Sequence, residues 1–358
     1  METDNSSSKQ TLNNSHKIIS CIINPAARDG QSIQIWESVK NKLEEKGLNT
    51  ELFITEKVGH ASEIAYSLRN RSDIQVIVAC GGDGTVHEVS SGLRGSEIPL
   101  AIIPAGTGND VARVHGYSLD DLENIIDIII NGIDRNIGAL RIEAEPMPEE
   151  DNYPCPAPDI KWNGITNKKN KIVRWIFHET DSGITSLVSR AKLRRGKWIK
   201  GNLKYTYLGI TEILKWRKRN AWVKIDDNSP VIINFSLFVF TLSEFFGGGY
   251  WVAPGASPIK NHAYLCKAWN LTRLQMLLLM GPLRKGKHIG KWGITLTKCK
   301  KLEIKSVNQE NEPVDIAHDP PLPINVDGEP CLQTPAIIEF HPKQLWLRGS
   351  KDVSWDVS

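Results

Sequence analysis

The stretch Ile74-Gln75-Val76-Ile77-Val78-Ala79, followed by Cys80-Gly81-Gly82-Asp83-Gly84-Thr85, decides the fold class of this 358-residue chain. Its first half has the length of one strand and is almost wholly apolar, and its second half is a glycine-rich loop. A strand that is apolar on both faces is typical of a parallel sheet covered by helices on both sides. The stretch therefore predicts the centre of an α/β domain.

Similar strands flank this one in the sequence. Apolar runs at residues 17–23 and 99–103 also end in loops rich in Gly, Pro and Asn, and a further strand is expected at residues 50–55. Between these strands, apolar residues recur at steps of three and four, as they do on one face of a helix. We therefore predict a parallel-sheet domain over residues 17–135, preceded by a disordered polar tail over residues 1–16.

The pattern changes after residue 135. Residues 143–171 are polar and proline-rich, which indicates an insertion, and short β-like segments separated by Gly, Pro and Asn come after it. This pattern predicts an antiparallel β-sandwich over residues 136–347, with a C-terminal tail at residues 348–358. The segment from 185 to 219 is the exception, because its pattern predicts helix. The expected fold class is thus α/β with two domains.

Composition favours a folded protein of the cytoplasm. Hydrophobic residues make up 40% of the chain, charged residues 24%, and the net charge is +3. No apolar run approaches the roughly 20 residues of a membrane-spanning helix, and residues 1–16 lack the apolar core of a secretory signal. The six cysteines are far apart and show no metal-ligand spacing, so we expect reduced core thiols.

Three loops carry the first sign of chemistry. The segments 24–30, 81–85 and 104–110 each follow an apolar strand and precede a helix. Ligands of parallel sheets bind beyond the carboxyl ends of the strands, and glycines let backbone N–H groups approach an anion closely. Together the loops predict a polyphosphate site, although a single loop of this kind is as often a plain turn. Thr85 with Glu88 also suggests a capping box, which would be a purely structural role.

Asp83 distinguishes a catalytic reading from a structural one. A carboxylate next to phosphates repels them unless a divalent cation lies between, so the loop predicts Mg²⁺. Neither the GxxxxGK[ST] loop nor the GxGxxG turn occurs in the chain. The usual P-loop and dinucleotide-binding interpretations therefore lose their support.

These motifs resemble those of a known family. Gly81–Thr85 with Val86-His87-Glu88, the Asn24-Pro25 loop, and Pro104-x-Gly106-Thr107-x-Asn109-Asp110 are similar to the diacylglycerol kinase catalytic domain of bacterial lipid kinases, which are related to sphingosine kinases. The resemblance extends over residues 17–347. It implies a nucleotide-binding domain like that of NAD kinases and phosphofructokinases, a β-sandwich domain, and a cleft between the two for ATP and a lipid.

The resemblance also implies the site residues. Late in the chain, Val326-Asp327-Gly328-Glu329 matches the family's DGE motif, which makes Glu329 the proton acceptor, assisted by Asp327. Without the upstream loops, Asp327-Gly328 would be read as a hairpin turn. The ligands of the metal are left unassigned. The residues implied around the nucleotide are Asn24, Pro25, Ala26, Ala27, Arg28, Thr55, Gly81, Gly82, Asp83, Gly84, Thr85, Val86, His87 and Thr107.

The sequence departs from the family pattern in the second domain. The family usually has an Asp-Gly pair that helps to hold a structural Mg²⁺, and here Asn261 and His262 stand in its place. An asparagine of the family, upstream of Asp181-Ser182-Gly183, is replaced near His178. A neutral amide is a weaker ligand for a hard cation, so the structural metal site is in question.

A strongly basic stretch indicates a partner. Residues 190–219 contain eleven lysines and arginines and one acid, Glu212, together with Trp198 and Trp216. Tryptophan among cations suits the surface of an anionic membrane, whereas a solvated basic face and a nucleic-acid site are the alternatives. We expect membrane docking, on the inner face of the membrane, and no nucleic acid, because no nucleic-acid-binding motif accompanies the stretch.

The sequence thus predicts a lipid kinase that uses ATP and Mg²⁺ and phosphorylates a hydroxyl of a diacylglycerol-like or other long-chain lipid alcohol. An NAD-kinase-like enzyme would share the GGDGT motif but would act on a soluble substrate. A non-catalytic regulator that binds lipid or nucleotide is the third reading, motivated by the departures at His178, Asn261 and His262. The pattern assigns neither the acceptor lipid nor the oligomeric state.

Overall fold

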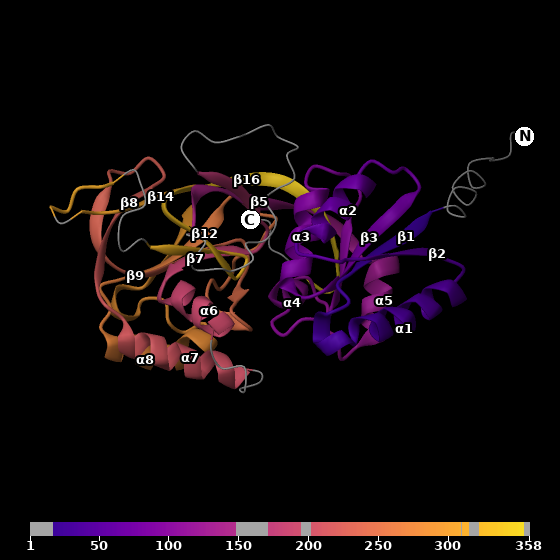
Figure 1. Ribbon diagram of the computed structural model, residues 1–358, viewed down its shortest axis with the longest axis horizontal. Helices are drawn as coiled ribbons and strands as arrows, with labels where there is room; N and C mark the ends of the chain where they lie inside the picture. Colours follow the sequence, from indigo (N-terminus) through magenta and orange to yellow (C-terminus); the bar gives the residue numbers. More distant parts are fainter. Residues whose placement is uncertain (1–16, 148–170, 195–201, 309, 315–321, 354–358) are drawn as a thin grey trace, which may run out of the picture.

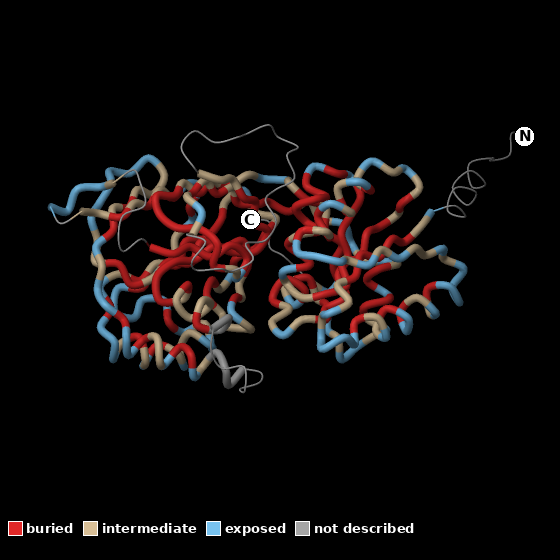
Figure 2. Tube along the Cα trace, in the orientation of Figure 1, coloured by how far each residue is buried: buried red, intermediate tan, exposed pale blue. Residues whose placement is uncertain are grey.

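The computed structural model describes residues 17–147, 171–194, 202–308, 310–314 and 322–353. They form two domains that lie side by side, each with its own buried interior (Figures 1 and 2). The predicted tail at residues 1–16 and Cys155 lie outside the described residues, as does most of the predicted insertion. The other five cysteines are buried and free of disulfides. Each described helix is too short or too polar to cross a membrane.

The N-terminal domain is built on parallel strands. They pair in the order β2-β1-β3-β4, and every pairing among them is parallel. The apolar runs of β1, β3 and β4 are buried almost throughout, while no residue of β2, at the edge, is fully buried. The strands are β1 (Ile18–Ile23), β2 (Asn49–Ile54), β3 (Ile74–Gly81) and β4 (Leu100–Pro104).

Helices cover both faces of these strands (Figure 1). The helix α1 buries Trp36, Val39 and Leu43, the side chains whose spacing predicts it, and packs beside α5. The helices α2 and α3 pack against each other on the opposite face. The helices of this domain are α1 (Ser32–Glu45), α2 (His60–Leu68), α3 (Asp83–Leu93), α4 (Asp110–Val114) and α5 (Leu122–Asn131), with a 3-10 turn η1 (Ala27–Gly30).

One long strand joins the two domains. The strand β16 (Glu329–Gly349) pairs antiparallel with β5 (Ile133–Pro146), and near its end Leu347 pairs in parallel with Leu100 of β4. The parallel strands are therefore one part of a continuous mixed sheet and do not form a separate sheet. The domain boundaries expected after residues 135 and 347 both fall inside these strands.

The C-terminal domain is antiparallel. Its strands pair in a closed ring, β9-β7-β15-β16-β14-β8 and back to β9, so the two layers expected of a sandwich are joined at both edges. Leu, Ile, Val and Phe side chains fill the interior. The strands are β6 (Ile172–Ile176), β7 (Glu179–Gly183), β8 (Arg219–Ile225), β9 (Val231–Thr241), β12 (Ala263–Trp269), β13 (Thr295–Cys299), β14 (Lys301–Ser306) and β15 (Pro323–Val326).

Helices α6 (Ile184–Arg194), α7 (Asn202–Lys215) and α8 (Arg273–Arg284) lie along one side of this domain (Figure 1). With a small hairpin, β10 (Phe245–Phe246) and β11 (Tyr250–Trp251), and a 3-10 turn η3 (Lys291–Gly293), they enclose a third apolar cluster. The prediction of helix as far as residue 219 is wrong at its end, because Arg219 already begins β8. Trp216 is buried in the cluster and is not an interfacial side chain.

Candidate active site

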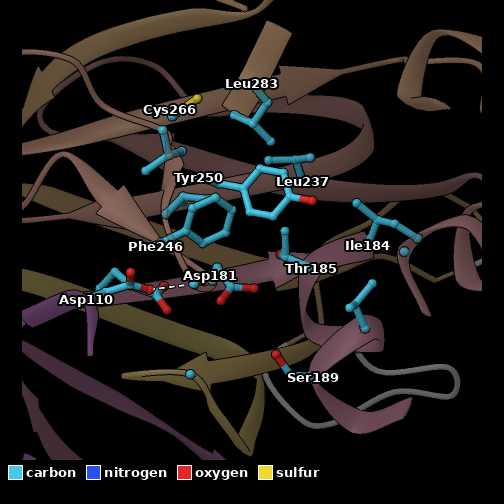
Figure 3. Close-up of a pocket in the computed structure, with 18 of the residues that line it drawn as sticks. Asp110, Asp181, Ile184, Thr185, Ser189, Leu237, Phe246, Tyr250, Cys266 and Leu283 are labelled. Carbon is cyan, nitrogen blue, oxygen red and sulfur yellow. Dashed lines mark hydrogen bonds between the residues drawn. The ribbon is translucent and has the colours of Figure 1, made fainter. Parts of the chain in front are cut away.

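A cavity of about 320 Å³ lies where the two domains meet. Residues from the loops after β3 and β4 line one end, and side chains of the C-terminal domain line the rest. Figure 3 shows the polar side chains Asp110 and Asp181 at one end and Phe246, Tyr250 and Leu283 at the other. The apolar lining comes from Ile184, Val188, Ile213, Leu237, Val239, Phe246, Tyr250, Val252, Ala268, Leu271, Met276, Leu279, Met280, Leu283 and Ile294.

Backbone contact between two loops shapes the polar end. The N–H of Ala105 donates to the carbonyl of Gly81 at 2.7 Å, so the loops after β3 and β4 begin side by side. A Cβ atom at Gly106 would lie 2.5 Å from the Cα of Gly82, which excludes any larger residue without movement of the backbone. Asn109 holds the second loop closed, because its side chain bonds both the N–H and the carbonyl of Gly106.

The first turn of α3 faces the cavity without a side-chain cap. Gly82 is the N-cap residue, and within the described part of the chain this helix start has no side-chain cap hydrogen bond. The predicted capping box is wrong: Thr85 is inside the helix, and Glu88 accepts from the N–H of Ala61 on α2. A helix N-terminus with uncapped donors and glycines suits a phosphate group.

Two aspartates lie at this turn, the half-buried Asp83 and the buried Asp110. Burial, and next the charge of Asp110, raise the pKa of Asp83. Asp110 accepts from Arg113 at 2.5 Å and from the N–H of Gly248 in the C-terminal domain at 2.6 Å. Mg²⁺ in phosphoryl-transfer sites is held by one or two carboxylates together with phosphates and water, and this pair fits that role. Among the described residues, no set of three or more metal-ligating side chains is gathered into a site.

Asp327 is held rigidly between the domains. Its carboxylate accepts from Nδ1 of His87 on α3 at 2.5 Å and from the N–H groups of Phe177, His178 and Glu179 at 3.0–3.2 Å. Burial acts to raise the pKa of Asp327, but the hydrogen bond and charge of His87 outweigh it, and the pKa is lowered. With four donors on its oxygens, Asp327 is suited to positioning rather than to proton transfer.

The turn that contains Asp327 aims the next carboxylate. Asp327 and Gly328 both have positive φ, 46° and 84°, and Glu329 follows at the start of β16. Glu329 is half-buried and lines the same cavity as Asp83 and Asp110. The structure therefore brings the two ends of the predicted site, about 240 residues apart in the chain, to one cavity.

Two further carboxylates in the cavity were not foreseen. Glu179 and Asp181 lie on the same face of β7 and are both buried. Burial, and then the charge of Asp181, raise the pKa of Glu179, and Oε2 of Glu179 has no hydrogen-bond partner among the described residues. Asp181 accepts from Asn325 at 2.9 Å. Charged residues inside a strand, at residues 179 and 181, were the signal in the sequence.

The remaining predicted nucleotide residues lie at the same edge of the sheet. The N–H of Asn24 donates to the carbonyl of Cys80, and that of Thr55 to the carbonyl of Ile23, so these loops are neighbours. Of the predicted set, Asp83, Gly84 and Thr107 line the cavity. The others, among them Pro25, Ala26, Ala27 and Arg28 around η1, and Val86 inside α3, are not part of its wall.

The position of the family's structural metal is positively charged here. Burial lowers the pKa of His262, and the charges of Lys298, Lys260 and Lys300 lower it further. Asn261 next to it is exposed. Three lysines around a neutral imidazole and an amide disfavour a divalent cation, so the residues present do not fit this second metal.

The comparisons with known proteins agree with this arrangement. Residues 19–142 match the model described as diacylglycerol kinase catalytic domain, and residues 179–348 match the model described as YegS C-terminal NAD kinase beta sandwich-like domain. The two matched regions follow one another along the chain and between them cover most of both domains. The chain belongs to the diacylglycerol kinase catalytic domain family, which includes lipid kinases and has sphingosine kinases among its relatives.

Individual relatives are distant. A diacylglycerol kinase of Mycobacterium tuberculosis is 23% identical over 330 residues, 91% of this chain and 93% of that protein. A diacylglycerol kinase of Staphylococcus carnosus is 25% identical over 337 residues, 93% of this chain and 95% of that protein. A solved diacylglycerol kinase structure from Bacillus anthracis superposes with a TM-score of 0.65 at 15% identity, covering 95% of this chain and 98% of that one. The last likeness concerns the fold alone.

Proposed function

We propose that this protein transfers the γ-phosphate of ATP to a hydroxyl group of a diacylglycerol-like or other long-chain lipid alcohol. The observation that carries the proposal is the single cavity that runs from the loops of Asp83 and Thr107 to an apolar wall in the C-terminal domain. The cavity therefore suits an anionic ligand at one end and an apolar ligand at the other. A nucleotide and a lipid meet these two requirements.

The nucleotide lies at the glycine loops in this proposal. The uncapped first turn of α3 and the backbone of residues 106–108 donate to its phosphates. Asp83 and Asp110 would hold an Mg²⁺ that accompanies them, and such a cation would offset the charge of the phosphates. Relief of the repulsion between these two carboxylates would favour its binding.

Glu329 is the proton acceptor in this proposal. The acceptor hydroxyl oxygen attacks the γ-phosphorus, the bond from that phosphorus to the β,γ-bridging oxygen breaks, and the hydroxyl proton passes to the Glu329 carboxylate. Asp327 is too well bonded to take this proton, and it fixes the turn that presents Glu329. Its assistance to Glu329 is thus one of position.

The apolar wall favours a lipid over the two alternatives. An NAD-kinase-like enzyme would have to place the polar ribose of NAD against side chains such as Leu237, Val239 and Phe246. Leaving polar groups of a ligand unpaired in such surroundings costs several-fold to many-fold in affinity. A regulator without catalysis would have no need of a half-buried carboxylate at Glu329 in the same cavity as Asp83.

The test is an incubation of the full chain with γ-labelled ATP, Mg²⁺ and a panel of lipid alcohols in mixed micelles, with NAD as the soluble acceptor. We expect label in at least one lipid and none in NADP. Labelled NADP without labelled lipid would replace the proposal by the NAD-kinase reading. Absence of label in every acceptor, with ATP still bound, would favour the regulator.

A further inference from the structure

The helices α7 and α8 expose apolar side chains to the outside of the molecule. Tyr207, Ile210 and Leu214 of α7 are 45%, 38% and 55% exposed, and Leu274 and Leu278 of α8 are 66% and 55% exposed. The spacings of three and four residues put each set on one face of its helix. We call these five side chains the docking face.

The two helices form one antiparallel pair, so their exposed faces are neighbours. The guanidinium of Arg273, at the start of α8, donates to the carbonyl of Trp216 just after α7, at 2.9 and 2.7 Å. A second contact lies seven residues further along each helix from this one. A Cβ atom at Gly209 of α7 would lie 3.2 Å from Cε of Met280 of α8. Both helices lie at the outer edge of the C-terminal domain (Figure 1). The docking face therefore lies on two neighbouring helices.

Cations surround this surface. Residues 206–219 and 271–294 together contain nine lysines and arginines and one acid, Glu212, which is itself paired with Lys215. Lys215, Arg217 and Lys218 are exposed at one end of the helix pair, and Arg284, Lys285 and Lys287 are exposed at the other. Part of this charge belongs to the basic stretch seen in the sequence, although the side chains of residues 192–205 lie outside the description.

The opposite faces of the same helices form the wall of the cavity. Gly209 and Ile213 of α7 and Met276, Leu279 and Leu283 of α8 line it. A partner that covers the docking face thus lies directly across one helix pair from the apolar end of the cavity. Each of these helices is apolar on two sides, which is unusual for a helix with one side exposed to solvent.

We propose that the docking face binds the surface of an anionic membrane, with its five apolar side chains in the headgroup–acyl boundary and the cations at both ends of the helix pair on lipid phosphates. Charge decides in favour of this occupant. An apolar face surrounded by cations fits anionic lipid, whereas a second copy of this chain would bring like charges together. The proposal does not depend on catalysis, since docking requires no nucleotide.

The experiment is sedimentation of the full chain with vesicles, in the absence of nucleotide. Vesicles of phosphatidylcholine alone are compared with vesicles in which a third of the lipid is phosphatidylglycerol. We expect binding to the anionic vesicles, reduced by salt. The double variant Leu274→Asp, Leu278→Asp should bind roughly a hundredfold more weakly, because two leucines lose their burial in lipid and gain repulsion.

The matched control places the same change elsewhere on the domain. Val231 and Ile232 on β9 are also exposed, at 51% and 47%, and pair with β8 away from the helix pair. The double variant Val231→Asp, Ile232→Asp should bind vesicles like the wild type. Replacement of Lys285 and Lys287 by Gln should weaken binding about twenty-five-fold, since each cation near an anionic surface contributes about fivefold. Circular dichroism checks that every variant is folded.

Three results would overturn the proposal. One is equal binding to neutral and anionic vesicles, or binding to neither. Another is equal loss of binding in the control variant and the Leu274→Asp, Leu278→Asp variant. The third is a wild type that sediments as a dimer and a Leu274→Asp, Leu278→Asp variant that sediments as a monomer with unchanged vesicle binding, which would assign the face to self-association. Lipid phosphorylation in micelles is a separate measurement. A failure of vesicle binding would therefore not decide the proposed function, which has its own test.

Discussion

At its polar end the cavity is shaped by the close approach of two loop backbones, whereas at its apolar end it is made of side chains from several separate elements. Gly106 approaches Gly82 so closely that only hydrogen fits at the Cα atom of Gly106. The apolar wall instead uses side chains from α6, α7, β9, β12 and α8. A backbone site tolerates almost no substitution, and a side-chain wall can be rebuilt by single substitutions.

This difference predicts where substitutions act. Changes at the polar end should affect every acceptor equally, because phosphate binding and proton transfer are common to all of them. Changes in the apolar wall should alter which acceptor is used and leave ATP binding alone. Of the four predictions below, the first three test this contrast and the last concerns stability in acid; they begin with the largest effect.

Glu329→Gln should lower kcat by roughly a hundredfold to ten-thousandfold for all acceptors, because it removes the proposed proton acceptor. Asp327→Asn should instead lower the stability of the folded chain, since it replaces the carboxylate that bonds His87 and three N–H groups. Steady-state kinetics and urea unfolding separate the two effects. Full activity of Glu329→Gln would remove this residue from the mechanism.

Gly106→Ala should raise KM for ATP by about thirtyfold or more, because the new Cβ atom would separate the loops after β3 and β4. Gly281→Ala on α8 is the matched glycine change, since a Cβ atom there meets nothing within 4 Å. We expect Gly281→Ala to keep the wild-type KM. Equal KM values in the two variants would contradict the close approach of the loops.

Ala268→Phe should shift the acceptor preference towards lipids with shorter chains. Ala268 is buried on β12 and lines the apolar wall, so a phenyl ring there would occupy space within the cavity. Each methylene that loses its burial costs about fourfold in affinity, and we expect about tenfold lower kcat/KM for long-chain relative to short-chain acceptors. KM for ATP should stay within about twofold of the wild type.

The smallest effect concerns acid. Burial lowers the pKa of His115, at the end of α4, to about 3, and the charges of Arg135 and His178 act in the same direction. In the unfolded chain the pKa is about 6.5, so below that pH the unfolded state binds a proton that the folded state does not. The contribution of His115 to folding stability should therefore be fully present above pH 6.5 and be lost as the pH falls towards 3. Between pH 7 and pH 5 this loss should amount to about 2 kcal/mol.

Urea unfolding at pH 7 and pH 5 measures this loss. The variant His115→Gln removes the titrating group, so it should lose about 2 kcal/mol less than the wild type between the two pH values. Its stability at pH 7 is compared separately. An equal pH dependence in the two proteins would assign the acid sensitivity to other buried groups.

The contrast between the two ends also explains what the sequence could predict. The strands and glycine loops of the N-terminal domain are visible because their signals lie in consecutive residues, such as residues 74–85. The bond between His87 and Asp327 is not visible, because it joins residues 240 positions apart through the packing of two domains. The capping box failed for a local reason: Gly82 in extended conformation begins α3 three residues before Thr85.

The apolar wall was not predictable from local pattern. Its members come from elements between α6 and η3, and each is an ordinary apolar residue in its own segment. The carboxylates Glu179 and Asp181 could have been noticed, since charged residues in a strand that is otherwise buried require a reason. Their place in the cavity depends on the antiparallel pairing of β7 with β9 and β15.

The path of β16 has a consequence for the order of synthesis. Leu345 and Leu347, near the end of this strand, belong to the core of the N-terminal domain, and the hydroxyl of Tyr117 donates to the carbonyl of Arg348. A ribosome that has made residues 17–135 has therefore released a domain that still lacks one strand. The N-terminal half of the protein is completed only when residues 345–348 emerge, so the two halves mature together rather than one after the other.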